Sequence, residues 1–188
     1  MPVASFDNTA LVLIDLQRGI LERPTVRPVR DVLRQSVRLA KAFRANRLPV
    51  VVVRVEWSED SGDLPPAACD RPGPAAAPRP PFGEIPAELV DLADVFITKR
   101  HWGAFTGTEL DLQLRRRRID RLVLAGIATS IGVESTARSA WEHSYELVFA
   151  EDATTDTDEA SHVHSFTKIF PRLGRVCSTE QILAALGA

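Results

Sequence analysis

The stretch Arg121–Trp141, RLVLAGIATSIGVESTARSAW, combines three local patterns that together indicate an α/β fold. It opens with an apolar run, Leu122–Ile127, which is typical of a fully buried strand. Small residues follow, and then a helical pattern begins whose expected buried face consists of Val133, Ala137, Ala140 and Trp141. A strand, a tight turn and a helix N-terminus in succession bring backbone N–H groups together, which suits a carboxylate or a developing oxyanion. The alternative interpretation is an ordinary strand-to-helix turn.

Length and composition limit the classes of protein to consider. The 188 residues suffice for one sizeable core, and we expect a single domain over residues 1–188. A formal net charge of −2 gives no electrostatic basis for binding nucleic acid or an anionic membrane. The two cysteines do not form a disulfide framework, and the N-terminal sequence has neither a basic leader nor an apolar run of membrane-spanning length. We therefore expect a cytoplasmic protein without nucleic-acid or membrane partners.

Strand and helix patterns alternate along the chain. Strands are predicted at Thr9–Asp15, Val50–Val55, Asp94–Thr98, Leu122–Ile127, Tyr145–Ala150 and Arg175–Cys177. A turn at Glu151–Ala153 is predicted to end the fifth of these strands. Helices are predicted at Val29–Arg47 and Pro86–Ala93, and two more are predicted to begin at capping boxes, one of Thr108 and Asp111 and one of Ser178 and Gln181. A further helix is predicted to begin at a Thr157 cap and to bury Val163, Phe166, Ile169 and Phe170. This alternation predicts a doubly wound, Rossmann-like three-layer α/β/α sandwich with a mostly parallel six-stranded sheet.

Residues 58–86 differ in kind from the rest of the chain. They contain most of the prolines, including the run RPGPAAAPRPPFG (71–83), and show no periodicity. We predict a long surface loop, because the strands on both sides are expected to belong to one sheet. Loops of this length are often lids or oligomer contacts. Cys69 lies in this loop, and without an adjacent base it is not expected to be a nucleophile.

Three residues lie at or after the carboxyl ends of predicted strands: Asp15, Lys99 and Gly132. Because the carboxyl ends of parallel strands meet at the same edge of a sheet, we expect these positions to converge on one crevice. We also expect substrate-binding residues near this crevice: Gln17 beyond the first strand, and Trp102 and Phe105 in the loop after Lys99. The alternative role for Asp15 is that of a turn residue that caps the loop after its strand.

The segment AGIATSIGVESTAR (125–138) resembles the signature of the isochorismatase-like hydrolases, a superfamily that includes nicotinamidases, N-carbamoylsarcosine amidases and isochorismatases. In members that carry a catalytic cysteine, an aspartate is the general base for the thiol and a lysine holds its charge. The resemblance assigns these two positions to Asp15 and Lys99. It also implies a non-proline cis peptide at Ile127–Ala128, with backbone N–H groups near Ala128 and Gly132 facing the substrate. Ala128 and Ile131 are therefore added to the expected substrate-binding residues.

Gly132 occupies the position of the nucleophilic cysteine found in most members of this superfamily. A glycine cannot form an acyl-enzyme, so cysteine-type amidase chemistry is not available by that route. The resemblance to true isochorismatases, which also have glycine here, implies a mechanism without a thiol. In that mechanism Asp15 protonates a vinyl ether as a general acid, water adds to the oxocarbenium ion and pyruvate is released. Lys99 would place the carboxyl group and pair with the substrate anion.

Three functional hypotheses remain open. The leading one is a small-molecule hydrolase that uses Asp15 and Lys99 without covalent catalysis. The second is a catalytically silent member of the fold that serves as a ligand- or protein-binding module. The third is a hydrolase that uses another nucleophile such as Ser130. The segment EWSEDSGD (56–63) does not resemble the substrate-binding loop of authentic isochorismatases, which weakens the assignment to that activity.

Metal and cofactor binding are not expected. No histidine occurs between Val50 and Arg100, so the metal site of the nicotinamidases is missing from the sequence. His162 and His164 are two residues apart in a predicted helix and therefore lie on different faces. The resemblance also implies a homo-oligomer, a dimer or larger.

Overall fold

The computed structural model describes residues 6–187, which form one six-stranded sheet. The strands are β1 (Thr9–Ile14), β2 (Val50–Val55), β3 (Val95–Lys99), β4 (Arg121–Ile127), β5 (Glu146–Thr155) and β6 (Arg175–Cys177). Their order is β3-β2-β1-β4-β5-β6, and every neighbouring pair is parallel. The predicted α/β fold with six strands is confirmed, and the sheet is parallel throughout rather than mostly parallel.

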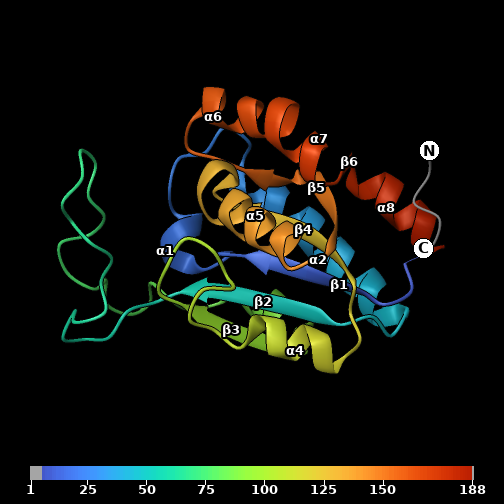
Figure 1. The fold of residues 1–188 in the computed structure, drawn as a ribbon, viewed down its shortest axis with the longest axis horizontal. Helices are drawn as coiled ribbons and strands as arrows, with labels where there is room; N and C mark the ends of the chain where they lie inside the picture. Colours follow the sequence, from blue (N-terminus) through green and yellow to red (C-terminus); the bar gives the residue numbers. More distant parts are fainter. Residues whose placement is uncertain (1–5, 188) are drawn as a thin grey trace.

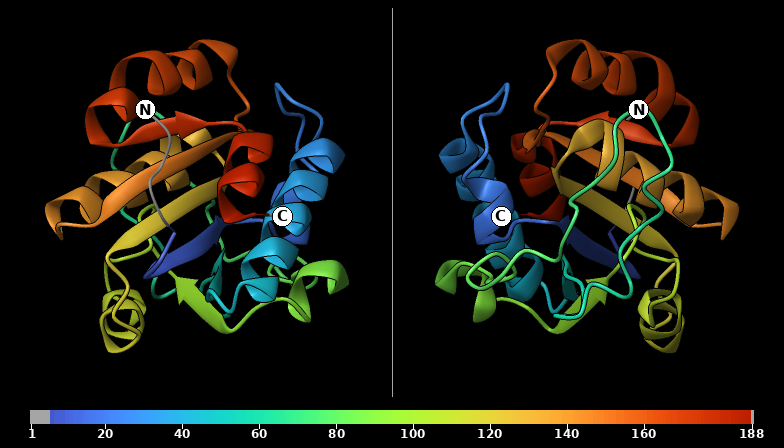
Figure 2. Two further views of the ribbon diagram at one scale, coloured as in Figure 1. Left: turned by 90° about the vertical axis from the view of Figure 1, so that its right-hand side faces the viewer. Right: turned by 90° about the vertical axis from the view of Figure 1, so that its left-hand side faces the viewer.

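Helices cover both faces of the sheet (Figures 1 and 2). They are α1 (Arg18–Leu21), α2 (Val29–Ala45), α3 (Ala87–Val90), α4 (Leu110–Arg116), α5 (Glu134–Glu142), α6 (Glu159–His164), α7 (Phe170–Leu173) and α8 (Thr179–Leu186), with π-helical turns η1 (Thr129–Val133) and η2 (Ser165–Ile169). Alternate residues of β1 face opposite sides: Leu11 and Leu13 pack with α2 and α8, whereas Val12 and Ile14 pack with α4 and α5. None of the helices formed by residues 6–187 is long and apolar enough to cross a bilayer.

The order of the strands creates a crevice beside β1. The chain builds outward from β1 to β3 and then returns to place β4 on the other side of β1, so the connections after β1 and β4 diverge. In parallel α/β sheets, ligands bind at such a switch point, beyond the carboxyl ends of the strands. Gly126 keeps β4 close to β1: its φ is +126°, and a Cβ there would lie 2.0 Å from the carbonyl oxygen of Ile14.

β5 is longer than the sequence predicted. The turn expected at Glu151–Ala153 is wrong, because the strand continues to Thr155 after a shift in its pairing with β4. Asp152, in the shifted segment, accepts hydrogen bonds from the backbone N–H and the hydroxyl of Thr179, both at the start of α8. The irregular residues are thus held by α8 instead of leaving the sheet.

Two predicted helix caps are corrected by the structure, and a third is confirmed. Glu109, not Thr108, occupies the N-cap position of α4, and the hydroxyl of Thr108 donates to the carbonyl oxygen of Ala104. Asp158, not Thr157, caps α6 by accepting from the backbone N–H of Ser161. The capping box of Ser178 and Gln181 at the start of α8 is confirmed.

Two predicted core residues are exposed. Trp141 is 55% exposed, because the face of α5 that packs against the sheet consists of Thr136, Ala137 and Ala140. Val163 is 49% exposed at the end of α6, while Phe166 and Phe170 are buried as predicted. The packed face of α5 is therefore made of small side chains, which allow the helix to approach the sheet closely.

The proline-rich segment is a loop, as predicted. Residues 56–86, between β2 and α3, contain no helix or strand. In Figure 1 this segment extends past the carboxyl ends of the strands, and the right-hand view of Figure 2 shows it crossing in front of the sheet edge. Its position therefore places it over the crevice between β1 and β4.

Candidate active site

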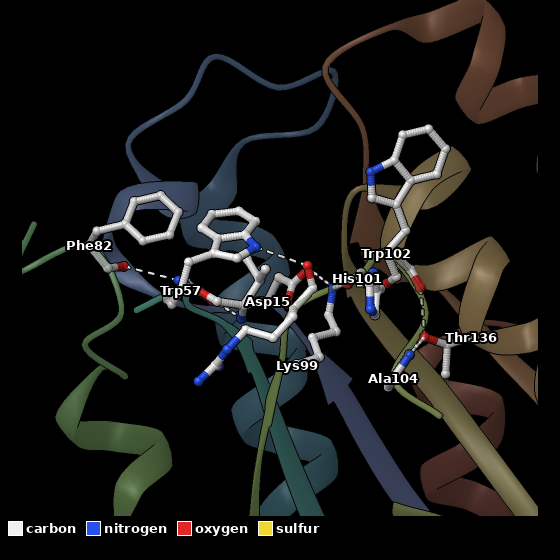
Figure 3. Close-up of polar contacts among 12 residues, drawn as sticks. Asp15, Trp57, Phe82, Lys99, His101, Trp102, Ala104 and Thr136 are labelled. Carbon is white, nitrogen blue, oxygen red and sulfur yellow. Dashed lines mark hydrogen bonds and ion pairs between the residues drawn. The ribbon is translucent and has the colours of Figure 1, made fainter. Parts of the chain in front are cut away.

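Asp15 and Lys99 meet beyond the carboxyl ends of β1 and β3 (Figure 3). The Nζ atom of Lys99 lies 2.9 Å from Oδ2 of Asp15 and donates to the carbonyl oxygens of His101, at 3.1 Å, and Trp102, at 2.8 Å. These acceptors use all three N–H groups of the ammonium. The side chains of Lys99 and Asp15 are only 2% and 8% exposed. The pair is therefore buried and fixed in orientation.

The backbone of Asp15 is fixed in an uncommon conformation. Its N–H donates to the carbonyl oxygen of Val53, and its φ of +54° is one that few residues other than glycine, asparagine and aspartate adopt.

The surroundings of Asp15 raise the pKa of its carboxyl group. Burial raises the pKa of Asp15 to about 6, against the lowering effects of Lys99 and Arg23. Its second oxygen, Oδ1, is buried and has no hydrogen-bond partner among the described residues. A carboxyl group with this pKa can give up and recover a proton near neutral pH.

Gly132 lies directly against this carboxyl group. A Cβ built on Gly132 would be 3.0 Å from Oδ2 of Asp15 and 3.0 Å from Cγ2 of Ile14. Any side chain at position 132 would therefore contact Asp15. The backbone is held by Thr136, whose hydroxyl donates to the carbonyl oxygen of Gly132 and accepts from the N–H of Ala104 (Figure 3).

The peptide bond between Ile127 and Ala128 is cis, as the resemblance implied. Ala128 begins the segment that leads into η1, and its carbonyl oxygen accepts from the N–H groups of Ile131 and Val133. Ile127 and three residues after it, Ala128, Ile131 and Gly132, line a cavity beside Asp15.

A cavity of about 530 Å³ lies over the Asp15–Lys99 pair. One part of its lining comes from the strand ends and the segments after them, and another comes from the proline-rich loop. The lining residues are Asp15, Ile20, Arg23, Val55, Trp57, Pro65, Pro66, Cys69, Arg71, Gly73, Pro74, Lys99, Arg100, His101, Trp102, Ile127, Ala128, Ile131, Gly132 and Thr157. A cavity of this size accommodates a small molecule.

Comparison with known proteins places this chain in a family. The model of the isochorismatase domain matches residues 9–181. The chain belongs to the isochorismatase family. It is 48% identical over 181 residues to the uncharacterized isochorismatase family protein YecD of Escherichia coli O157:H7, a match that covers 95% of this chain and 96% of YecD.

Other members of the isochorismatase family are similar over nearly their full length. YwoC of Bacillus subtilis (strain 168), also an uncharacterized isochorismatase family protein, is 39% identical over 186 residues, covering 95% of this chain and 94% of YwoC. The structure of an isochorismatase family protein from Burkholderia thailandensis has a TM-score of 0.93 and 41% identity, covering 99% of this chain and 100% of that one. Both the sequence and the arrangement of elements are thus those of the family.

Two residues expected to bind substrate in this isochorismatase family protein lie outside the cavity lining. Gln17 is fully buried, and both ends of its amide bond to backbone: Nε2 donates to the carbonyl oxygens of Val55 and Phe82, and Oε1 accepts from the N–H of Val55. The ring of Phe105 stacks on that of His143 and packs at a tilt against that of Tyr145. Both expectations are corrected, because these side chains fix the protein's own structure.

Ser130 is not placed as a nucleophile. Its hydroxyl and its backbone N–H both donate to Oδ2 of Asp156, at 2.8 and 2.7 Å, and it is not among the residues that line the cavity. Asp156 is buried and anchors the turn before α5. Within residues 6–187 no three histidine, cysteine, aspartate or glutamate side chains are grouped so as to hold a metal ion.

Several residues of the cavity were missed from the sequence. Arg23 follows α1, Arg100 follows Lys99, and Cys69 and Arg71 come from the proline-rich loop. Arg100 could have been found from its place next to Lys99 at a strand end. The loop residues gave no such signal, because the segment has no periodicity that predicts which side chains turn inward.

Proposed function

We propose that this isochorismatase family protein is an enzyme that hydrolyses a small molecule by acid catalysis without a covalent intermediate. Asp15 is the general acid, and Lys99 holds its carboxyl group in place. The observation that carries the proposal is the buried Asp15 carboxyl group in the cavity, with its pKa near 6 and one oxygen unpartnered. A group with this pKa is partly protonated under physiological conditions, as a general acid requires.

The proposed reaction is the hydrolysis of a vinyl ether such as that of isochorismate. Asp15 donates its proton to the terminal carbon of the double bond, which leaves an oxocarbenium ion. A water molecule adds to this ion and loses a proton, which returns to Asp15. The hemiketal then breaks its carbon–oxygen bond to give pyruvate and an alcohol. No step requires a nucleophilic side chain, which fits the glycine at position 132.

Gly132 supports this reaction by leaving space beside the acid. Because a side chain at this position would contact Oδ2 of Asp15, its absence leaves room for substrate or water over the carboxyl group. We infer that Ala128, Ile131 and Trp102 contact the substrate, since all three line the cavity. Trp102 is 63% exposed and lies at its edge.

We also infer that residues 1–188 form one domain, which acts in the cytoplasm as a homo-oligomer, a dimer or larger. Two tryptophans support the oligomer. Trp102 and Trp141 are both more than half exposed, and tryptophan is enriched in protein interfaces. Sedimentation or light scattering measures the assembly directly.

Incubation of the wild-type protein with isochorismate tests the proposed function. We expect release of pyruvate, measured with lactate dehydrogenase and NADH. We also expect no increase in the mass of protein that is denatured while turnover is in progress. A trapped covalent adduct would contradict the non-covalent mechanism. Absence of pyruvate release from isochorismate bound to the protein would favour a binding module over an enzyme.

A further inference from the structure

Unpartnered polar atoms are concentrated at the cavity. Within residues 6–187, three buried side-chain polar atoms have no hydrogen-bond partner: Oδ1 of Asp15, Nη1 of Arg100 and Oγ of Ser36. The first two belong to residues that line the cavity, whereas Ser36 lies on α2. Buried donors and acceptors are nearly always paired in proteins, so an unpaired one calls for a functional explanation. An acceptor of Asp15 and a donor of Arg100 are thus left unpaired in two residues that line the same cavity.

The cavity also carries an excess of positive charge. Its charged lining residues are Asp15, Arg23, Arg71, Lys99 and Arg100, which are four cations and one carboxylate. Asp15 pairs with Lys99, and Asp63, which is not a lining residue, pairs with Arg100. Arg23 and Arg71 form no ion pair within 4 Å among the described residues. A ligand that enters this cavity is therefore favoured if it is negatively charged.

Arg100 is the best fixed of the three arginines. Its Nε lies 2.5 Å from Oδ2 of Asp63, a residue of the proline-rich loop. The other oxygen of Asp63 accepts from the backbone N–H and the hydroxyl of Ser58, both at 2.8 Å. The indole N–H of Trp57 donates to the carbonyl oxygen of Arg100 at 2.9 Å. The beginning of the loop thus holds Arg100 in one position beside Lys99.

The guanidinium retains donors for a ligand. Only its Nε is used by Asp63, and Nη1 is covered by protein without an acceptor. The side chain as a whole is 39% exposed and lines the cavity, so part of the guanidinium can be reached by a ligand while Nε stays paired with Asp63. The planar fork of an arginine matches the two oxygens of a carboxylate, and such charge-assisted hydrogen bonds are stronger than neutral ones.

We propose that Arg100 binds a carboxylate of the substrate and determines specificity for anionic small molecules, and that Asp63 positions it. This inference rests on the proposed function, since it takes the cavity over Asp15 as the substrate site. The substrate class is a small carboxylic acid whose scissile bond lies beside Asp15 while its carboxylate lies at Arg100. Asp63 is a positioning residue, because it contacts the guanidinium of Arg100 and not the substrate.

Binding of benzoate and benzamide tests this proposal without turnover, because the two molecules have the same ring but differ in charge. We expect the wild-type protein to bind benzoate about tenfold more tightly than benzamide by titration calorimetry or NMR. In Arg100→Gln we expect the ratio of the two affinities to fall about fivefold, because Arg23 and Arg71 remain in the cavity and keep part of the preference for the anion. Arg54→Gln is the matched control: Arg54 is 38% exposed and pairs with Glu56 at 3.1 Å, but it does not line the cavity. It should keep the wild-type preference.

An unchanged preference for benzoate in Arg100→Gln, or no preference in the wild-type protein, would overturn the proposal. If the melting temperature shows that Arg100→Gln is unfolded, Asp63→Asn serves instead, and we expect it to lower the preference for benzoate by about threefold. An unchanged preference in Asp63→Asn would then overturn the proposal. A protein that prefers benzoate through Arg100 but releases no pyruvate from isochorismate would refute the proposed reaction and leave the assignment of Arg100 intact.

Discussion

Asp15→Asn is expected to lower pyruvate release from isochorismate by about 10²–10⁴-fold, the usual contribution of a general acid. Asparagine has nearly the shape of aspartate, and its carbonyl oxygen can still accept the 2.9 Å hydrogen bond from Lys99. It has no carboxyl proton to donate to the substrate. The variant should therefore fold and bind isochorismate while losing the chemical step, so kcat falls much more than KM changes.

Asp94→Asn is the control for this substitution. Like Asp15, Asp94 is an ion-paired carboxylate, and its partner is Arg44. It accepts a hydrogen bond from the backbone N–H of Val50 and precedes β3, at the opposite end of the sheet from Asp15. We expect it to keep wild-type turnover. Wild-type rates in Asp15→Asn would show that another group supplies the proton.

Lys99→Met is expected to destabilise the protein by about 3–5 kcal/mol at pH 8, because it leaves a buried carboxylate without its cation. Methionine fills a similar volume, but the carbonyl oxygens of His101 and Trp102 lose their donor. Without Lys99, burial raises the pKa of Asp15 further above the value of about 6. A folded-state pKa above that of the unfolded chain gives stability that is lost as pH rises through it. The destabilisation should therefore be smaller at pH 5, where Asp15 is protonated.

Urea unfolding at pH 5 and pH 8 measures this difference. The double variant Asp15→Asn with Lys99→Met should be more stable at pH 8 than Lys99→Met alone, because it removes the unpaired carboxylate. Equal destabilisation by Lys99→Met at both pH values would show that the two side chains do not interact in the folded protein.

The parts of the fold that depend on hydrophobic pattern were predictable from the sequence. β2 and β6 have the predicted bounds. The six residues of Val50–Val55 are too few for a typical helix, and their β-branched side chains favour a buried strand. The errors occur where tertiary contacts override local pattern. Asp152 holds the shifted part of β5 to α8, and the small residues of α5 leave Trp141 outside. Neither contact can be read from neighbouring residues.

The same distinction applies to the candidate site. Asp15, Lys99 and Gly132 could be placed together because each follows a parallel strand, and the topology of the sheet brings strand ends to one edge. Gln17 and Phe105 were assigned to the crevice only from their proximity in sequence, and both turn into the protein instead. Arg100 depends on Asp63, a partner 37 residues away in a loop without periodicity, so its role became visible only in three dimensions.

The pH dependence of kcat/KM for wild-type turnover of isochorismate tests most directly whether Asp15 acts as a protonated carboxyl group, because kcat/KM reports the pKa values of the free enzyme. Since burial raises the pKa of Asp15 to about 6, the acid form predominates below that value and is lost above it. We predict that kcat/KM is constant at low pH and falls about tenfold per pH unit above pH 6. A kcat/KM that rises with pH through this range, as for a general base, or that stays constant from pH 5 to pH 8, would contradict the role of Asp15 as the acid.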